Sequence, residues 1–328
     1  MSPRTRVLAV VAVAAAVAVA AVVSVALLQT HGESTTQPGA VTAPRKGVPP
    51  LEFNFGVEDT ATTRAIAHAA ALYNAGHRAE AAPIFGRYSS LEARIGSAFS
   101  QWPGHALDDM KELVSSHPTS AVAELHLGLA LLWEGRDADA VKAWTRANAV
   151  QPDSPAAVDA ESWLHPGYAF GLPFIISGVS LPPALAKLPA ARQLAVLSRN
   201  AAAPGAGATA KLLYGLALWN LDRPVSAERA LNAAAALAPH DPLVQTAAAV
   251  AAFTKSKPAA AFARLGPLSG TFPKAAVVRL HLGLLLIWTR QAVKGEQQLK
   301  LAVADGPKTV YGKQAMAILA GLAKGGTR

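Results

Sequence analysis

The sequence of 328 residues contains no cysteine. This absence excludes a disulfide framework, a cysteine-ligated metal site, a thiol nucleophile and a lipid-modified cysteine as membrane anchor. Aromatic residues make up only 6% of the chain and charged residues 16%, whereas hydrophobic residues, many of them alanine, make up 52%. Runs of β-branched residues at strand spacing are few, and alanine is the strongest helix former. We therefore expect an all-α protein.

The motifs of catalysis and of tight cofactor binding are also missing. The chain has no His-Glu-x-x-His, no two histidines four residues apart, no Gly-x-Ser-x-Gly and no phosphate-binding glycine loop. Asp108, Asp109 and Glu112 gather acidic charge, but on a surface helix we expect them to be solvated. The sequence therefore predicts a protein that is not an enzyme, with no catalytic residue, no cofactor and no metal site.

The formal net charge is +9. A positive balance of this kind suits anionic envelope polymers or lipid headgroups. No dense Lys/Arg run is interleaved with aromatic residues, so we do not expect nucleic acid as a partner.

One stretch of the sequence occurs more than once. Residues 124–136 read ELHLGLALLWEGR and residues 279–291 read RLHLGLLLIWTRQ, which places His126 and His281 at the same point of the two copies. A weaker third copy, KLLYGLALW, covers residues 211–219. Self-similarity of this kind is the signature of a repeat architecture, in which each repeat buries its apolar face against its neighbours.

Small residues and prolines recur at fixed distances from these copies. In each copy a glycine is followed by apolar residues, one of them alanine, and then by a closing proline. The first copy has Gly128, Ala140, Trp144 and Pro152, and the second has Gly215, Ala227, Leu231 and Pro239. The third has Gly283, Leu299, Ala302 and Pro307. Between the second and the third copy lies a degenerate copy with Ala249, Ala252, Ala261, Leu265 and Pro273, so three consecutive units start about 34 residues apart. This pattern resembles the tetratricopeptide repeat (TPR) family. The resemblance implies an all-α, TPR-like α-solenoid of helix-turn-helix repeats.

The glycines of the repeat have a physical reason. Gly128, Gly215 and Gly283 fall in the middle of expected helices, where glycine costs about 0.5–1 kcal/mol relative to alanine. A repeat array accepts this cost because a missing side chain lets the partner helix approach closely. The spacing therefore predicts that these three glycines lie at helix–helix contacts.

The N-terminal part of the chain predicts a membrane anchor. Residues 1–6 are short and basic, and residues 7–28 form a stretch of 22 residues without a charge, which is long enough to cross about 30 Å of hydrocarbon as a transmembrane helix. Basic residues before the span predict a cytoplasmic N-terminus and an extracytoplasmic C-terminal domain in a single-pass protein of the cell membrane. Cleavage of the same stretch as a signal peptide would instead give a secreted protein.

The rest of the chain divides into a linker and a repeat domain. Residues 29–58 are rich in Thr, Pro and Gly and predict a flexible linker, with Leu51 and its neighbours either weakly ordered or docked on the first repeat. Residues 59–328 are expected to form the solenoid. Its register breaks at residues 165–183, where three glycines and four prolines accompany large apolar residues. An insertion in a repeat often projects from the binding face.

The TPR resemblance also implies where a partner binds. In that family the first helices of the repeats line a concave face that holds a peptide segment. Carried over by spacing, and with the apolar insertion added, the predicted partner-binding residues are Leu125, Leu129, Leu132, Trp133, Leu212, Leu216, Trp219, Phe253, Leu280, Leu284, Trp288, Tyr168, Phe170 and Phe174. The lysine, arginine and asparagine residues with which some TPR proteins clamp a carboxylate are not found here.

Three interpretations of this apolar face remain open at the sequence level. In the first, residues 165–183 fold onto the face as an internal plug, with Phe170, Phe174, Ile175 and Ile176 against Trp133 and Trp219. Alternatively, a partner segment or a lipid-like molecule covers it, or its residues are simply core between helices. The favoured function is a non-catalytic, membrane-tethered scaffold that binds a protein or peptide partner. The alternative is a carrier of a lipid or another hydrophobic small molecule.

Overall fold

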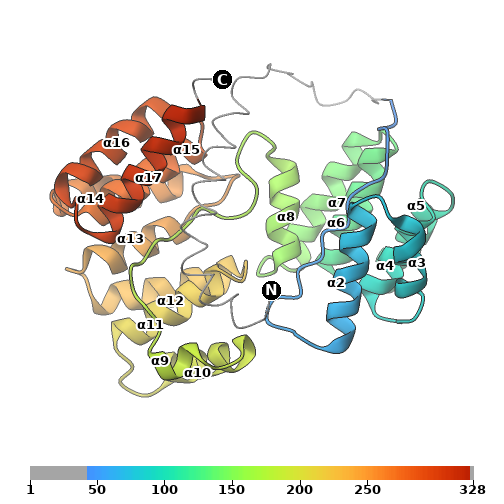
Figure 1. Cartoon of the computed structure of the whole chain (residues 1–328), viewed down its shortest axis with the longest axis horizontal. Coiled ribbons are helices and arrows are strands. Elements are labelled where there is room, and N and C mark those ends of the chain that lie inside the picture. The colour runs from blue at the N-terminus through green and yellow to red at the C-terminus, as the bar shows by residue number, and fades with distance from the viewer. Residues whose placement is uncertain (1–42, 326–328) are drawn as a thin grey trace. The chain divides into compact units, whose positions relative to one another are not determined.

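The computed structural model describes residues 43–325, which form sixteen α-helices and, within that range, no strand. The prediction of an all-α, TPR-like helical repeat fold is therefore confirmed. The described residues fall into two compact units, residues 43–164 and residues 165–325, which we call the N-terminal unit and the C-terminal unit (Figure 1). The chain passes from the first unit to the second at residue 165, where the predicted insertion begins.

The N-terminal unit consists of an extended segment and seven helices. The helices are α2 (Ala61–Asn74), α3 (Arg78–Phe85), α4 (Leu91–Ser100), α5 (Ala106–Ser116), α6 (Ala121–Trp133), α7 (Asp137–Val150) and α8 (Pro155–Leu164). They pack as three successive pairs closed by α8.

The C-terminal unit repeats this plan after its own extended segment. Its helices are α9 (Pro183–Ala186), α10 (Ala190–Ala202), α11 (Ala208–Trp219), α12 (Pro224–Leu237), α13 (Pro242–Ala251), α14 (Ala259–Thr271), α15 (Ala276–Trp288), α16 (Ala292–Asp305) and α17 (Val310–Gly325). Helices α11–α16 form three pairs, closed by α17 as α8 closes the other unit. We call the first helix of each pair an A helix and the second a B helix.

Close A–B packing explains the glycines of the repeat. A Cβ atom on Gly128 of α6 would lie 2.2 Å from the indole nitrogen of Trp144 on α7. On Gly215 and Gly283 it would lie 2.6 Å and 2.9 Å from the side chains of Leu231 and Leu299. All three distances are shorter than real Cβ contacts allow, so the large B-helix residue occupies the space that the glycine leaves. The predicted role of the three glycines is confirmed.

The turn between the A and B helices has the same backbone in four repeats. It contains a residue with positive φ, at Gly76, Gly135, Asp222 and Arg290. The N–H group of that residue donates a hydrogen bond to the carbonyl three residues earlier, which belongs in turn to Tyr73, Leu132, Trp219 and Ile287. These four A-helix residues therefore occupy one equivalent position, and Tyr73 and Trp219 are counterparts in the first pair of each unit.

The segment before α2 is part of the N-terminal unit rather than a flexible linker. Leu51 is only 3% exposed, and Phe53 and Phe55 pack against the same core. The prediction of a flexible linker over residues 29–58 is therefore wrong for residues 48–55. The segment is ordered because its backbone is hydrogen-bonded to side chains of α2 and α6, which lie far along the sequence.

The predicted membrane anchor at residues 7–28 and the cytoplasmic residues 1–6 lie outside the described residues. None of the helices between residues 43 and 325 combines the length and the hydrophobicity that a bilayer crossing requires.

Candidate functional site

Each unit binds an extended segment of its own chain. We call residues 48–55 the N-segment and residues 172–179 the C-segment; neither contains regular secondary structure. In Figure 1 the C-segment runs as a thin coil along the C-terminal unit before it reaches α9. Both segments contact A helices, and the same two types of contact hold the backbone of each.

His126 on α6 accepts a hydrogen bond from the backbone of the N-segment. Its Nδ1 lies 2.8 Å from the carbonyl oxygen of Val122, one turn earlier in the helix. A carbonyl can only accept, so Nδ1 carries the proton and Nε2 is left as an acceptor. The backbone N–H of Glu52 donates to that Nε2 over 3.1 Å. His126 is fully buried, and this burial lowers its pKa to about 4, which keeps the ring neutral at physiological pH.

His281 on α15 makes the same arrangement in the C-terminal unit. Its Nδ1 lies 2.7 Å from the carbonyl oxygen of Val277, and the N–H of Ile176 donates to its Nε2 over 2.9 Å. The side chain is buried, which again lowers the pKa to about 4. Both histidines stand two residues before the packing glycine of the third A helix. A neutral histidine at one repeat position thus accepts a backbone N–H in both units.

A second side chain binds a proline carbonyl in each segment. The hydroxyl of Tyr73 donates to the carbonyl oxygen of Pro49 over 2.9 Å, and the indole N–H of Trp219 donates to that of Pro173 over 2.7 Å. Tyr73 and Trp219 are the counterparts identified above from the A–B turn. Burial raises the pKa of Tyr73, so its hydroxyl keeps its proton and remains a donor.

The two contacts have the same register in both segments. The proline whose carbonyl is bound precedes the residue whose N–H is bound by three positions, Pro49 before Glu52 and Pro173 before Ile176. We call the pair of side chains, Tyr73 with His126 or Trp219 with His281, the backbone clamp. Because the clamp contacts one carbonyl and one amide three residues apart, it fixes the direction of each segment and holds it extended.

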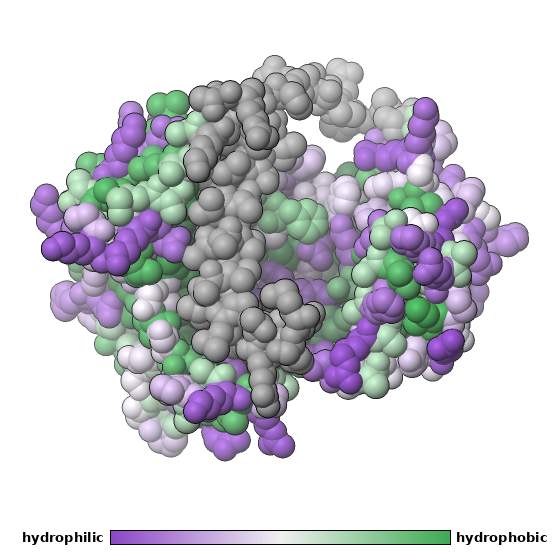
Figure 2. Space-filling model, viewed as in Figure 1, coloured by the Kyte–Doolittle hydropathy of each residue, from purple (hydrophilic) through white to green (hydrophobic). Residues whose placement is uncertain are grey.

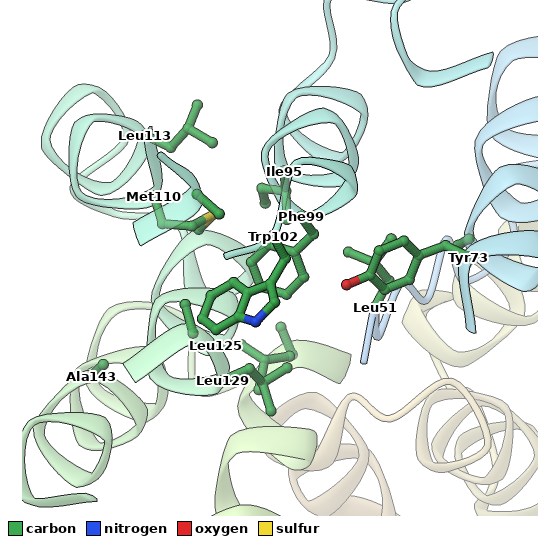
Figure 3. Packing of buried hydrophobic residues seen from close by; sticks show 14 of the residues in the cluster. Leu51, Tyr73, Ile95, Phe99, Trp102, Met110, Leu113, Leu125, Leu129 and Ala143 are labelled. Carbon is green, nitrogen blue, oxygen red and sulfur yellow. The ribbon is translucent and has the colours of Figure 1, made fainter. Parts of the chain in front are cut away.

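Further contacts fix the N-segment. The side-chain amide of Asn74 accepts from the N–H of Leu51 over 2.9 Å and donates to its carbonyl over 2.8 Å. The carboxylate of Glu52 accepts from the indole N–H of Trp163 on α8 over 3.0 Å, and its burial raises its pKa. Figure 3 shows Leu51 beside Tyr73 in the core that also holds Phe99 and Trp102. The segment therefore completes the core of its unit.

The C-segment has additional contacts of its own. The hydroxyl of Tyr311 on α17 donates to the carbonyl of Ser177 over 2.6 Å. Phe174 meets Trp288 edge to face, with 5.8 Å between ring centroids. Before the segment, Phe170 is 54% exposed and lies 5.7 Å from the ammonium of Lys255, a contact between a cation and an aromatic ring. Phe170 is thus the large aromatic side chain that this region presents to solvent.

Most of the predicted partner-binding residues are packed inside the two units. Leu125, Leu129 and Leu132 are buried in the N-terminal unit, and Leu212, Leu216, Trp219, Phe253, Leu280, Leu284 and Trp288 are buried in the C-terminal unit. Trp133 is half-buried, beside Arg45 and Trp163. Tyr168 and Phe174 are half-buried and Phe170 is exposed. Trp219 contacts the carbonyl of Pro173, which was not among the plug residues predicted to contact it, and Phe174 pairs with Trp288.

Sequence reasoning missed the residues that bind the backbone. Tyr73 and Asn74 carried no signal, because the repeat that holds them matches the family pattern only in part. The two histidines were visible only as a pair at equivalent points of the repeat. The signal that could have revealed their role is the parallel between Pro49-Pro-Leu-Glu52 and Pro173-Phe-Ile-Ile176.

The described residues show no arrangement that favours metal chemistry. Between residues 43 and 325, no three histidine, aspartate or glutamate side chains gather in a group that could hold a metal ion. Asp222 stands out among the carboxyl groups, because burial raises its pKa to about 6 although Lys255 lowers it in part.

Known proteins offer little beyond the helical repeat. No family model and no curated protein matches the chain. Similar solved structures include a tetratricopeptide repeat protein from Parabacteroides merdae, with 12% identity, a TM-score of 0.35, and coverage of 80% of this chain and 98% of that chain. The TPR2AB-domain:pHSP90 complex of yeast Sti1 has 12% identity, a TM-score of 0.32, and coverage of 81% and 98%.

Yeast Tom70 has 14% identity to this chain and a TM-score of 0.34; the match covers 93% of this chain and 54% of Tom70. TM-scores below 0.5 do not establish a shared overall fold. The description of this chain as TPR-like therefore stands on its repeat spacing, its A–B helix pairs and the glycine contacts between them.

Proposed function

We propose that this protein is a non-catalytic interaction scaffold that binds a polypeptide partner through its A helices. One observation carries the proposal: each unit already holds an extended polypeptide by its backbone, with the same clamp in the same register. Side chains that hydrogen-bond a carbonyl and an amide are suited to polypeptide and offer nothing specific to a lipid tail. The favoured setting is the outer side of the cell membrane, with residues 7–28 as anchor or, if cleaved, as signal peptide.

The alternative function, a carrier of a hydrophobic small molecule or lipid, has less support. The apolar residues predicted to receive such a ligand are mostly packed within the two units, and parts of that packing come from the chain's own segments. No polar or apolar contact among the described residues points to a lipid in preference to a polypeptide.

A photo-cross-linking experiment in the cells that make the protein tests the proposal. A photoreactive phenylalanine analogue replaces Phe170, which is exposed next to the C-segment, and in a control chain it replaces Val293, which is 72% exposed on the B helix α16. The scaffold predicts a defined polypeptide cross-linked from position 170 and not from position 293. Lipid alone cross-linked from position 170 would support the carrier, and equal products from both positions would contradict a specific site.

A further inference from the structure

The clamp contacts define which polypeptides fit. Three features are shared by the two segments, counted from the bound proline. The proline carbonyl accepts from Tyr73 or Trp219, the residue at the second position after it is aliphatic, Leu51 or Ile175, and the N–H at the third position donates to a neutral histidine. The first position differs, proline in one segment and phenylalanine in the other.

Each feature has a chemical reason. The aliphatic side chain packs into its unit, since Leu51 is 3% exposed and Ile175 packs against the core of the C-terminal unit. The residue at the third position cannot be proline, because proline has no N–H to donate. The proline at the start restricts its own φ and favours extended backbone before it, which lowers the entropy lost on binding.

A buried donor in each unit is left without a partner by the resident segment. The indole nitrogens of Trp133 and Trp288 are buried and have no hydrogen-bond partner among residues 43–325. The two tryptophans are counterparts, because each stands five residues after the packing glycine of its A helix. Trp288 contacts Phe174 of the C-segment, and the carbonyl of Trp133 accepts a hydrogen bond from the N–H of Arg45, just before the N-segment. A buried unsatisfied donor is costly, so a polypeptide that offered it an acceptor would bind better than the resident segment.

We propose that the backbone clamp is a binding site for an extended segment of a partner protein with the pattern Pro-x-(Leu/Ile)-x, in which the last residue is not proline. The partner segment takes the place of the resident segment, which acts as a ligand in cis. This inference rests on the proposed function and names the chemistry of its partner. The resident segment competes at the high effective concentration that its covalent attachment gives, so it keeps weak ligands out.

The test uses the full chain with its N-terminal clamp opened. Residues 49–55 are replaced by a Gly/Ser stretch of equal length, and a fluorescent peptide with the sequence of residues 46–57, KGVPPLEFNFGV, is added. The matched control peptide is methylated on the backbone nitrogen of the residue at position 52, which removes only the N–H that His126 accepts. A third peptide has the sequence of residues 170–181, FGLPFIISGVSL. Fluorescence anisotropy gives the dissociation constants.

The expected result is saturable binding of the first peptide and binding of the third within about tenfold. The methylated peptide should bind at least tenfold more weakly, and the unmodified chain should bind all three more weakly than the opened chain. Equal binding of the methylated peptide, or no binding of the first, would overturn the proposal. Failure of the third peptide alone would overturn the shared pattern.

Two provisions keep the test decisive. If circular dichroism shows that the fully replaced chain has lost helix, the double variant Pro49→Gly, Leu51→Ser takes its place. Peptide binding without a partner cross-linked from position 170 would support the clamp as a binding site and contradict the proposed function. A cross-linked partner without peptide binding would mean that the partner uses another surface.

Discussion

At the scale of single residues, His126 and His281 explain why the clamp needs an uncharged ring. A protonated histidine would turn a donor toward the donating N–H of Glu52 or Ile176, and the hydrogen bond would be lost. Burial prevents this by lowering both pKa values to about 4. Keeping the rings neutral lowers the stability of the folded state when the pH falls.

The first prediction follows from this linkage. Between pH 6.5 and pH 4, unfolded histidine binds a proton while the folded one does not, so each histidine lowers the free energy of unfolding as the pH falls. The difference from an ordinary pKa of about 6.5 corresponds to about 3 kcal/mol per histidine. His126→Gln should be less stable than the wild type at pH 7, and the difference should shrink toward pH 4.5 in urea titrations.

Other groups act in the opposite direction, so the comparison must be between variants. The raised pKa values of Glu52 and of Asp222, the latter about 6, mean that these groups favour the folded state less as the pH rises through their folded values. They are present in wild type and variant alike and cancel in the difference. A stability difference between wild type and His126→Gln that does not change with pH would contradict the assignment.

A second prediction concerns the packing glycines. Gly128→Ala places a methyl group where the Trp144 ring lies, and we expect a loss of about 1–3 kcal/mol because the ring must move. Gly270→Ala, near the end of α14 and with open space around the new methyl group, is the matched control and should gain up to about 1 kcal/mol. Chemical denaturation of both variants measures the two effects. Equal gains in both variants would show that helix propensity, not A–B contact, decides.

At the scale of elements, the two segments pack against the helices of their units and extend the cores, although neither segment is helical. The N-segment supplies Leu51 to the core, and its backbone amide and carbonyl groups find side-chain partners instead of a neighbouring strand. This is why a stretch without periodicity can still be fixed. Its order depends on a few side chains of α2 and α6.

The third prediction tests that dependence. Tyr73→Phe keeps the ring and removes the hydroxyl that binds the Pro49 carbonyl, and we expect a loss of about 1–2 kcal/mol with faster amide exchange in residues 48–55. Tyr88→Phe is the control, since no hydrogen bond of the Tyr88 hydroxyl occurs within the described residues. Unchanged exchange in the N-segment after Tyr73→Phe would show that Leu51 and Asn74 hold it without the clamp.

Local signals in the sequence predicted most of the elements. The closing prolines of the repeat mark helix ends, since Pro152, Pro239 and Pro307 each stand two residues after the end of a B helix, α7, α12 or α16. The role of the segments could not be predicted in this way. The bond from Glu52 to His126 joins residues 74 positions apart, and nothing near residue 52 in the sequence records it.

At the scale of the whole molecule, the two units share the same order of structural elements. Each unit has an extended segment, three A–B pairs, a clamp on the first and third A helices and a closing helix. The residues between α8 and α11, which interrupt the repeat register, thus contain the segment of the second unit rather than an insertion in the first. Figure 2 shows hydrophilic side chains interspersed with apolar ones on the visible surface of the helices.

The fourth prediction is that each unit folds without the other. Residues 43–164 and residues 165–328, produced separately, should each be helical by circular dichroism and should unfold cooperatively, because each contains its own core and its own segment. A version of the second fragment that begins at residue 183 lacks the C-segment and should be markedly less stable. Fragments that remain unfolded would show that the two units depend on each other.

The most direct test of the account is the protonation state of the two clamp histidines. In the full chain labelled with ¹⁵N-histidine, NMR spectra at pH 5.5 should show two of the nine histidines as neutral rings protonated on Nδ1, and these signals should disappear in His126→Gln and His281→Gln. That result would establish Nε2 as the acceptor in both units. Titration of both rings near pH 6.5, or protonation on Nε2, would contradict the clamp.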